Sequence, residues 1–362
     1  MTAKRLIMAA GGTGGHIFPA RAAAETLIAR GWRVRLITDA RGARHTDGFP
    51  GEGVSVIRAA SPFQSNPLRL AGALGDLAAG LRATRAIVKD FEPDVAAGFG
   101  GYPAFALLAA ARISGLPFVI HEQNAVLGRV NRLFARSAHT VASGFDRLDR
   151  LPRKARHAVT GNPVRAAVLT AGDTPYAPPQ PDGEIRLLVL GGSLGARILS
   201  QTVPTAIAQL PEALRARLSV VQQTRDESLE AARAAYDAAG VRAELSAFFD
   251  DMGARYATAH LVISRAGASS VSELAAIGRP SILVPLAIAM DDHQSANAQG
   301  LVQAGAADAM AEADFTADSL SQRLESLLAD GEALAARAAA ARAAGRSDAH
   351  EALTDLIERA AE

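Results

Sequence analysis

The strongest constraint on this chain is a run of glycines close to its N-terminus. Residues 11–16 read GGTGGH; a short apolar run precedes them at residues 6–9, and an amphipathic segment follows at residues 19–31. This order predicts a buried parallel strand, a loop and a helix, with Pro19 in the first helical turn and Gly31 at the C-cap. Glycine lets a ligand approach the backbone without meeting a Cβ, and helix N-termini bind anions. Because a bare turn would use one or two of the four glycines, the stretch predicts a ligand loop.

The spacing of these glycines does not match two common nucleotide motifs. It is not G-x-G-x-x-G, and nothing in the chain reads G-x-x-x-x-G-K-[ST]. A dinucleotide fingerprint and a P-loop are therefore both unsupported.

Length and composition narrow the class of protein. A chain of 362 residues predicts two domains, and 49% apolar with 21% charged residues is typical of a globular protein. The formal net charge of +1 gives no reason to expect a nucleic-acid partner, and the absence of cysteine excludes disulfides, thiolate metal sites and a cysteine nucleophile. No apolar run reaches the length of a membrane span or a signal peptide, so we expect a cytosolic chain that can still lie against a membrane.

Short apolar runs alternate with alanine-rich helical stretches throughout the chain. After the first unit, strands are expected at residues 34–38, 54–57, 94–98, 117–121 and 140–142. Alternation of this kind predicts α/β architecture, with parallel sheets covered on both faces.

The opening pattern recurs near the middle of the chain. A proline-rich stretch at residues 170–184 predicts a linker or exposed loop, after which an apolar run (185–190), a glycine loop (191–195, GGSLG) and a helix near residue 196 follow. The two glycine loops start 180 residues apart, at positions 11 and 191. We therefore expect two Rossmann-like domains that bind ligands beyond the carboxyl ends of their strands, across a cleft between the domains.

The second half contains further helix starts. Residues 266–273 follow a strand at 261–264, and Ser270 and Glu273 have the spacing of a capping box. A strand at 282–284 precedes a polar loop at 291–294 and a helix near residue 297. An alanine-rich helix is expected at residues 319–344 and a last short helix at 351–361.

The motifs occur in an order that is specific as a set. Taken together, the chain resembles the MurG family of transferases, which make peptidoglycan lipid II, from its first strand to its last helix. The matching segments are residues 11–16 (GGTGGH), 100–103 (GGYP), 121–124 (HEQN), 161–165 (GNPVR), 191–196 (GGSLGA), 264–273 and 294–297. Two positions depart from the family pattern: Leu194 stands where many members have glutamine, and Phe249 stands where an aliphatic residue can occur beside the uracil.

The resemblance implies the GT-B fold and an inverting transfer of GlcNAc. UDP-GlcNAc would donate to the 4-hydroxyl of the MurNAc-pentapeptide on undecaprenyl pyrophosphate (lipid I), at the cytoplasmic face of the inner membrane. It implies an N-terminal acceptor and membrane-side domain at residues 1–163 plus about 346–362, and a UDP-GlcNAc-binding domain at 164–345. No cofactor is expected.

The family also implies roles for individual residues of the donor site. Arg165 matches a phosphate-binding arginine, Glu273 a carboxylate that accepts both ribose hydroxyls, and Gln294 a residue that binds GlcNAc hydroxyls. The remaining donor-side candidates are Asn124 at the sugar, Phe249 at the uracil, Ala268 and Ser269 along the diphosphate and uridine, and Ser193 at a phosphate. From the residues alone, a surface arginine, a helix cap at Ser193 or Glu273 and a polar loop residue at position 294 remain open alternatives.

The chemistry of the leaving group bears on metal dependence. Cleavage of a nucleotide-sugar bond leaves a pyrophosphate with growing negative charge, and positively charged or hydrogen-bond-donating groups have to stabilise that charge. The chain contains no D-x-D and no cluster with metal-ligand spacing. We therefore expect helix N-termini, N–H groups and Arg165 to serve instead of a metal, with Thr13, Gly14 and Gly15 holding the acceptor pyrophosphate or the donor sugar.

Direct displacement also needs a base for the acceptor hydroxyl. His16 closes the first glycine loop, and an unperturbed histidine has a pKa near 6.5. Glu122 is the rival candidate, and it is also possible that neither residue is the base.

A basic amphipathic segment at residues 68–89 adds a membrane hypothesis. It carries five spaced apolar residues together with Arg69, Arg82, Arg85 and Lys89. Such a helix can lie on anionic lipid or pack its leucines on its own sheet.

Three functions are compatible with these patterns. The first is the lipid I GlcNAc-transferase; the second is another UDP-sugar transferase or epimerase of the same fold; the third is a non-catalytic nucleotide-sugar-binding subunit. The ordered motifs, and the presence of both glycine loops in one chain, favour the first.

Overall fold

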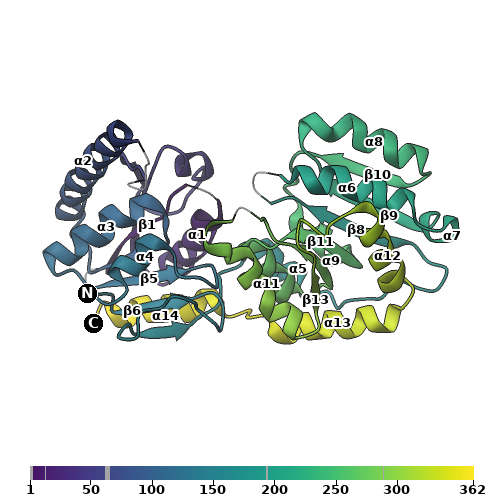
Figure 1. Ribbon diagram of the computed structural model, residues 1–362. Helices are drawn as coiled ribbons and strands as arrows, with labels where there is room; N and C mark the ends of the chain where they lie inside the picture. Colours follow the sequence, from purple (N-terminus) through teal and green to yellow (C-terminus); the bar gives the residue numbers. More distant parts are fainter. Residues whose placement is uncertain (1–2, 13, 62–65, 193–194, 288) are drawn as a thin grey trace. The chain divides into compact units, whose positions relative to one another are not determined.

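The protein consists of two compact α/β units. The computed structural model describes residues 3–12, 14–61, 66–192, 195–287 and 289–362 (Figure 1). Unit 1 comprises Met1–Arg165 with Asp348–Glu362, and unit 2 comprises Ala166–Ser347. Thr13, Ser193 and Leu194, three positions of interest in the sequence, lie outside the described residues.

Unit 1 is built on a seven-stranded, all-parallel sheet in the order β3-β2-β1-β4-β5-β6-β7. The strand order reverses beside β1, so the carboxyl ends of β1 and β4 form the switch point at which such sheets bind ligands. The elements of unit 1 are β1 (Arg5–Ala9), α1 (Gly14–Ala29), β2 (Arg33–Thr38), η1 (Gly42–His45), β3 (Val54–Val56), α2 (Pro67–Phe91), β4 (Val95–Gly98), α3 (Gly101–Ser114), β5 (Phe118–Glu122), α4 (Arg129–Phe134), β6 (Thr140–Ser143), β7 (His157–Val159) and α14 (Ala349–Ala360).

Alternate residues of β1 face opposite sides of this sheet, as strand geometry requires. Leu6 and Met8 join a buried cluster that includes residues of α1 and α14, whereas Ile7 and Ala9 join a second cluster that includes residues of α2 and α3. The C-terminal helix α14, yellow in Figure 1, packs beside α1. The sheet is thus covered on both faces, which confirms the prediction made from the continuous apolar runs.

Unit 2 repeats the plan with a six-stranded, all-parallel sheet in the order β10-β9-β8-β11-β12-β13. Its switch point lies at β8 and β11, the strands that precede the second glycine loop and the third helix start. The elements are α5 (Ala166–Ala171), β8 (Ile185–Leu190), α6 (Arg197–Ala208), α7 (Glu212–Arg215), β9 (Leu218–Gln223), η2 (Asp226–Ser228), α8 (Leu229–Ala238), β10 (Arg242–Ser246), α9 (Met252–Thr258), β11 (Leu261–Arg265), α10 (Ala268–Ile277), β12 (Ser281–Val284), η3 (Met290–Asp292), α11 (His293–Gln303), β13 (Ala307–Ala309), α12 (Ala317–Leu328) and α13 (Gly331–Ala344).

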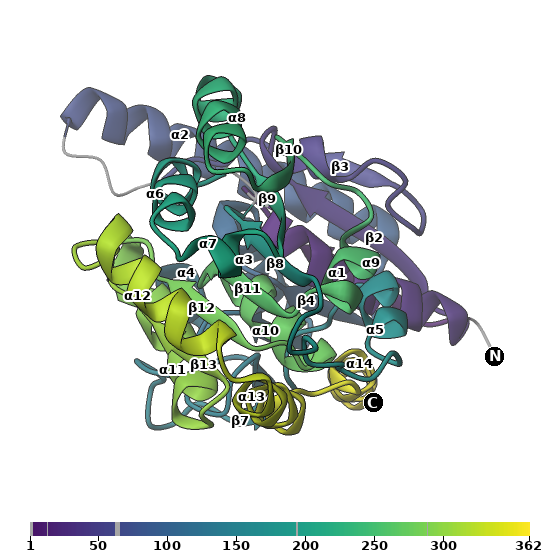
Figure 2. The same ribbon diagram turned by 90° about the vertical axis from the view of Figure 1, so that its right-hand side faces the viewer.

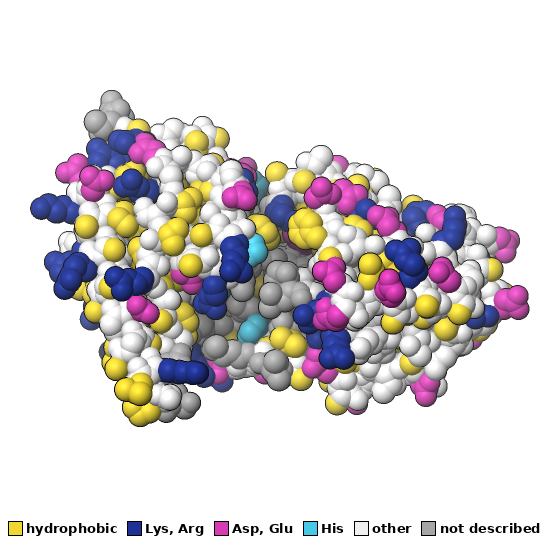
Figure 3. All heavy atoms as spheres, turned by 90° about the horizontal axis from the view of Figure 1, so that it is seen from above, with side chains coloured by type: hydrophobic (Ala, Val, Ile, Leu, Met, Phe, Trp, Pro, Cys, Tyr) yellow, Lys and Arg dark blue, Asp and Glu magenta, His cyan; other side chains and the backbone are white. Residues whose placement is uncertain are grey.

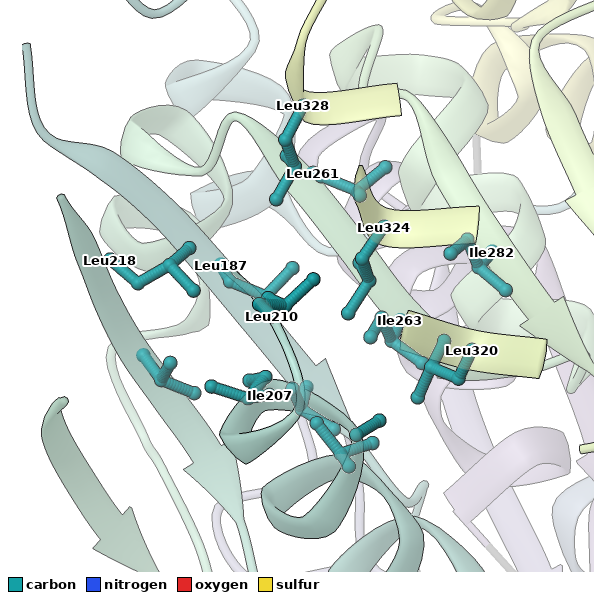
Figure 4. Close-up of a cluster of buried hydrophobic side chains, with 14 of the residues drawn as sticks. Leu187, Ile207, Leu210, Leu218, Leu261, Ile263, Ile282, Leu320, Leu324 and Leu328 are labelled. Atoms are coloured by element: carbon teal, nitrogen blue, oxygen red, sulfur yellow. The ribbon is translucent and has the colours of Figure 1, made fainter. Parts of the chain in front are cut away.

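The core of unit 2 lies between its sheet and helices α6 and α12. Figure 4 shows Leu187 of β8 and Ile263 of β11 reaching toward Ile207 of α6 and Leu324 of α12. In Figure 2, α8 lies beside β10, the edge strand of the same sheet. These buried aliphatic side chains hold β8 and β11 in place, and a glycine-containing turn follows each of the two strands.

Several helix boundaries differ from the sequence expectation, including that of α11, which begins at His293 inside the polar loop expected at residues 291–294. Helix α1 begins at Gly14, so Pro19 lies inside it and not in its first turn. At the sixth helical residue, a proline has no N–H to donate to the carbonyl of Gly15, and its ring crowds that carbonyl. The N-cap of α10 is Gly267, which places Ser270 inside the helix and makes the capping-box interpretation of Ser270 and Glu273 wrong.

The long helix expected at residues 319–344 is two helices. Helix α12 ends at Leu328, and α13 starts anew with Asp330 as its N-cap, whose side chain accepts the Ala333 amide at 2.9 Å. A capping aspartate inside an alanine-rich run was the signal for this break.

Helix α2 buries only part of its apolar side. Leu77 is buried, but Leu68 and Leu74 are 84% and 53% exposed, and Arg82 and Arg85 are exposed as well. Figure 3 shows Lys and Arg side chains in dark blue among yellow hydrophobic ones on the surface of unit 1. Of the helices in the described part of the chain, none is both long enough and apolar enough to cross a bilayer.

Candidate functional site

The first glycine loop packs against the start of α3, at the switch point of unit 1. A Cβ on Gly11 would lie 2.4 Å from Cδ of Pro103, and a Cβ on Gly101 would lie 2.9 Å from the Gly11 carbonyl oxygen. Gly12 and Gly101 also have positive φ values of 83° and 77°. The GGYP and GGTGGH motifs therefore need glycine to let two backbone segments of the same unit approach each other.

One amide of this loop is already satisfied by a side chain. Asp39, buried just after β2, accepts the Gly12 amide at 3.1 Å and the Gly42 amide at 2.7 Å through the same oxygen, Oδ1. The Gly12 N–H therefore has a partner within unit 1. Helix α1 starts at Gly14, and the first backbone N–H groups of a helix have no carbonyl partner within the helix. The N–H groups of Gly14 and Gly15 are therefore the part of the loop that can still donate to a ligand.

His16 is the third residue of α1 and stands directly over this switch point. A Cβ on Gly100 would lie 2.9 Å from Cε1 of the His16 ring, so the ring packs on the bare backbone where β4 leads into α3. Its Nδ1 atom is 2.9 Å from Oε1 of Gln123. The sequence placed His16 at the end of the first glycine loop, and the structure adds Gln123 as the neighbour that contacts its ring.

Gln123 connects His16 to a second, fully buried histidine. Its Nε2 atom lies 3.0 Å from Nδ1 of His121, and Nε2 of His121 lies 3.2 Å from the Gly161 carbonyl oxygen. Burial lowers the pKa of His121 to about 4. Asn162 holds this arrangement by donating to the Gln123 carbonyl at 2.9 Å.

Glu122, the rival candidate for the base, is held by four hydrogen bonds. It is the last residue of β5 and is buried, and Oε1 accepts from the backbone and side-chain nitrogens of Asn124 at 3.1 and 3.2 Å. Oε2 accepts from the Gly128 amide and the Asn131 side chain, both at 2.8 Å. Four donors therefore tie this carboxylate, and Asn124 with it, to the loop that leads into α4.

Arg165 is the last residue of unit 1. Its guanidinium lies 5.7 Å from the ring centroid of Phe18, which is on α1 two residues after His16. A partly exposed arginine is thereby placed beside the helix whose N-terminus follows the glycine loop.

The second glycine loop is held as the first one is. The Gly191 amide donates to Oε1 of Gln223, the last residue of β9, at 3.1 Å. Gly192 and Gly195 have positive φ values of 79° and 67°, which glycine adopts freely. In each unit, a side chain at the carboxyl end of the neighbouring strand thus accepts one amide of the glycine loop: Asp39 beside β2 and Gln223 in β9.

The start of α10 brings together the donor-side candidates of unit 2. Ala268 is the first residue of the helix, Ser269 follows it partly exposed, and Glu273 is buried one turn later. Oε2 of Glu273 accepts from the Tyr256 hydroxyl at 3.2 Å. Asn297, on α11, donates to the Ala266 carbonyl at 3.1 Å and so ties α11 to this turn.

Two further candidates, Gln294 and Phe249, belong to the same unit. Gln294, in the first turn of α11, accepts the Leu286 amide at 3.0 Å through Oε1, which directs its NH2 group away from that loop. Phe249 is buried between β10 and α9, and the Arg255 guanidinium lies 4.0 Å from its ring centroid. The expected candidates of unit 2 that the structure describes therefore lie on loops at the carboxyl ends of its strands or on the helices that follow.

Sequence reasoning missed the residues that hold the others in place. Asp39, His121, Gln123 and Gln223 were visible as polar residues at the ends of apolar runs, but a strand end alone does not say which side chain faces which loop. For metal binding, no three His, Asp or Glu side chains of the described residues are grouped closely enough to hold an ion.

Comparison with known proteins agrees with this architecture. The N-terminal domain model of glycosyltransferase family 28 matches residues 6–143, and the C-terminal domain model of the same family matches residues 186–353. The solved structure of MurG from Acinetobacter baumannii superposes with a TM-score of 0.79 at 30% identity, covering 98% of this chain and 99% of that one. UDP-GlcNAc 2-epimerase from Neisseria meningitidis, solved with UDP-GlcNAc bound, gives a TM-score of 0.67 at 13% identity over 98% of this chain and all of that one, which shows a shared fold alone.

Relatives whose names state an enzymatic activity match this chain over 99% of its length. The UDP-N-acetylglucosamine–N-acetylmuramyl-(pentapeptide) pyrophosphoryl-undecaprenol N-acetylglucosamine transferase of Maricaulis maris is 60% identical over 99% of this chain and 98% of its own length. The protein of the same designation from Caulobacter vibrioides is 48% identical over 99% of both chains. The two domain matches, the GT-B architecture and these near full-length identities together show that the chain belongs to the MurG family of N-acetylglucosamine transferases.

Proposed function

We propose that this chain transfers GlcNAc from UDP-GlcNAc to the 4-hydroxyl of MurNAc in lipid I and so forms lipid II. The observation that carries the proposal is the 60% identity, over nearly the full length of both chains, with a transferase whose designation states this donor and acceptor. The arrangement of both switch points supports it. The epimerase likeness, at 13% identity, concerns the fold and does not favour a second function.

In the proposed reaction His16 is the general base. Nε2 of His16 takes the proton of the acceptor 4-hydroxyl while that oxygen forms a bond to C1 of GlcNAc. The bond from C1 to the β-phosphate oxygen breaks, and its electron pair leaves with UDP, so the configuration at C1 inverts. His16 is favoured over Glu122 because both oxygens of Glu122 already accept hydrogen bonds, three from the loop before α4 and one from Asn131 in α4.

The growing charge on UDP has to be neutralised as the bond breaks. We assign this to Arg165 and to the amides at helix N-termini, with Ser193 and the start of α10 at Ala268 and Ser269 on the nucleotide. Glu273 would accept the ribose hydroxyls and Phe249 would lie at the uracil. Gln294 and Asn124 would bind the sugar, and Thr13, Gly14 and Gly15 the acceptor pyrophosphate or the sugar.

The exposed leucines and arginines of α2 support a peripheral association with the cytoplasmic face of the inner membrane. Leu68 and Leu74 offer apolar contact, and Arg82 and Arg85 offer charge attraction to anionic lipid. Charge reversal at Arg82 and Arg85 should weaken sedimentation with phosphatidylglycerol vesicles, whereas reversal at the exposed Arg359 on α14 should not. Equal binding by both variants would contradict this association.

The reaction is tested with the purified chain, UDP-GlcNAc and a lipid I analogue. We expect one UDP released for each β-linked disaccharide formed, at the same rate with and without EDTA. Free GlcNAc or its 2-epimer without disaccharide would contradict the transfer, and loss of activity that Mg²⁺ restores would contradict the metal-independent mechanism.

A further inference from the structure

We infer that Gln123 and the buried His121 fix the tautomer of His16, so that its Nδ1 carries a proton and its Nε2 presents a bare lone pair. Both are positioning residues that act through His16. The catalytic consequence rests on the proposed role of His16 as base, but the tautomer itself can be measured without any substrate.

The first step is the protonation of His121. Its Nε2 atom lies 3.2 Å from the Gly161 carbonyl oxygen, which can only accept a hydrogen bond. Nε2 therefore carries the proton. Because the ring is 1% exposed and burial lowers its pKa to about 4, His121 is neutral at pH 7 and its Nδ1 is a lone-pair acceptor.

The second step is the orientation of the Gln123 amide. Two acceptors face the same end of this side chain: Nδ1 of His121 at 3.0 Å and the backbone carbonyl oxygen of His121 at 3.3 Å. An NH2 group satisfies both with its two hydrogens, whereas a flipped amide would set its oxygen against both. The amide nitrogen therefore faces His121, and Oε1 faces the other way.

The third step carries this orientation to His16. Oε1 of Gln123 lies 2.9 Å from Nδ1 of His16, and a carbonyl oxygen requires a donor there. Nδ1 of His16 is therefore protonated, and in the neutral ring Nε2 is left as the acceptor. Gln123 is 2% exposed, so burial restricts its side chain, and Asn162 holds its backbone by donating to the main-chain carbonyl oxygen at 2.9 Å.

The tautomer matters because only an unprotonated nitrogen can take the proton of the acceptor hydroxyl. The opposite tautomer would present an N–H at Nε2 and would have to rearrange before each turnover. A neutral amide also differs from a carboxylate, since it orients the ring without adding a negative charge beside it. When His16 becomes an imidazolium, its Nδ1–H still has the Gln123 oxygen as a partner.

The tautomer is tested by ¹⁵N NMR of histidine-labelled protein without substrate, with the signals of His16 assigned through His16→Gln. In the wild type, we expect a protonated Nδ1 and an unprotonated Nε2 in the neutral ring of His16. In Gln123→Leu, the Nε2–H form should appear, while the signals of His260, in unit 2, stay unchanged. An unchanged His16 tautomer in folded Gln123→Leu would overturn the inference.

A matched pair at His121 repeats the test where Gln123→Leu does not fold. His121→Asn keeps an acceptor oxygen near the position of Nδ1, and His121→Leu removes it, while both lose the contact to Gly161. We expect the Asn variant to keep the His16 tautomer and the Leu variant to lose it. If both variants keep the tautomer, or both lose it, the inference is wrong.

Activity separates this inference from the proposed function. If both hold, Gln123→Leu and His121→Leu lower kcat roughly 10- to 100-fold with smaller changes in KM, which is less than the roughly 10²- to 10⁴-fold contribution of general-base catalysis because His16 itself is still present. If the tautomer shifts but kcat does not, Gln123 and His121 do control the tautomer, but His16 is not the base. If His16→Gln abolishes turnover while the tautomer is insensitive to Gln123→Leu, His16 is the base, but Gln123 does not control its tautomer.

Discussion

The carboxylate of Asp39 accepts the amide of Gly12 at 3.1 Å, although the two residues lie 27 positions apart in the chain. The same oxygen accepts the Gly42 amide, so one buried side chain joins the glycine loop to η1. Gln223 does the same for Gly191 in unit 2. One described amide of each glycine loop is therefore anchored by a side chain of its own unit.

Removal of Asp39 should destabilise unit 1 because it leaves two amides without their acceptor. We expect Asp39→Ala to lower the free energy of unfolding by about 2–4 kcal/mol, and Asp39→Asn by about half as much. Urea denaturation followed by circular dichroism measures both. Asp76→Ala, which removes an exposed ion pair with Arg58 at 3.9 Å, is the control and should cost less than about 1 kcal/mol. Equal losses at positions 39 and 76 would show that the two amides do not depend on the carboxylate.

Substitution of Glu122 separates its two possible roles. Glu122→Gln replaces one acceptor oxygen with a donor against groups that already donate, so we expect a loss of about 3 kcal/mol in stability. The exposed Glu92→Gln is the control for loss of a carboxylate. A Glu122→Gln variant that keeps its melting temperature but loses kcat more than about 100-fold would instead mark Glu122 as the base.

Arg165→Ala should lower kcat/KM roughly 10- to 150-fold, because charge-assisted hydrogen bonds contribute about 1.5–3 kcal/mol. Arg165→Lys keeps the charge and should lose less. Steady-state kinetics with UDP-GlcNAc and a lipid I analogue measure the effect, and Arg359→Ala on α14 controls for loss of an arginine. An unchanged rate for Arg165→Ala would remove this residue from the site.

Glu273→Gln should mainly raise the KM for UDP-GlcNAc if the carboxylate binds the ribose. Tyr256→Phe removes the hydroxyl that donates to Glu273 at 3.2 Å and tests the structural contribution of this pair separately. If Glu273→Gln lowers the melting temperature as Tyr256→Phe does and leaves KM unchanged, the carboxylate is structural.

Stability should fall as the pH falls from about 6.5 to about 4. Burial lowers the pKa of His121 to about 4, and an unfolded histidine has a pKa near 6.5, so the unfolded chain binds the proton more readily across this interval. The stabilisation is complete above the unfolded value and is lost progressively down to the folded one. For His121 the difference amounts to about 3 kcal/mol. Denaturation curves at several pH values measure it, and His121→Asn should flatten the slope; an equal slope in that variant would place the titration elsewhere, for example at His260.

Much of the fold could be predicted from local patterns. The apolar run before Gly11 and the one before Gly191 both became central strands, because continuous apolar runs can only be buried on both faces of a sheet. The helix boundaries were predicted less accurately. The first helix starts at Gly14 and runs through Pro19, which was expected in its first turn. The N-cap of α10 is Gly267, whereas Ser270 was expected at that position. Tertiary packing decides such ends, since several residues in a row can begin a helix.

The sequence by itself determined the two α/β units and a glycine loop after the first strand of each, because apolar periodicity and glycine act through near neighbours on the chain. The ordered set of motifs gave the resemblance to the family. Only the tertiary structure decided which polar side chains meet. The contact of His16 with Gln123 spans 107 positions and the anchoring of Asn131 on Glu122 depends on a loop closing over β5. Hydrogen bonds work over about 3 Å, so partners far apart in the sequence are selected only after parallel strands have brought their ends to one edge of the sheet.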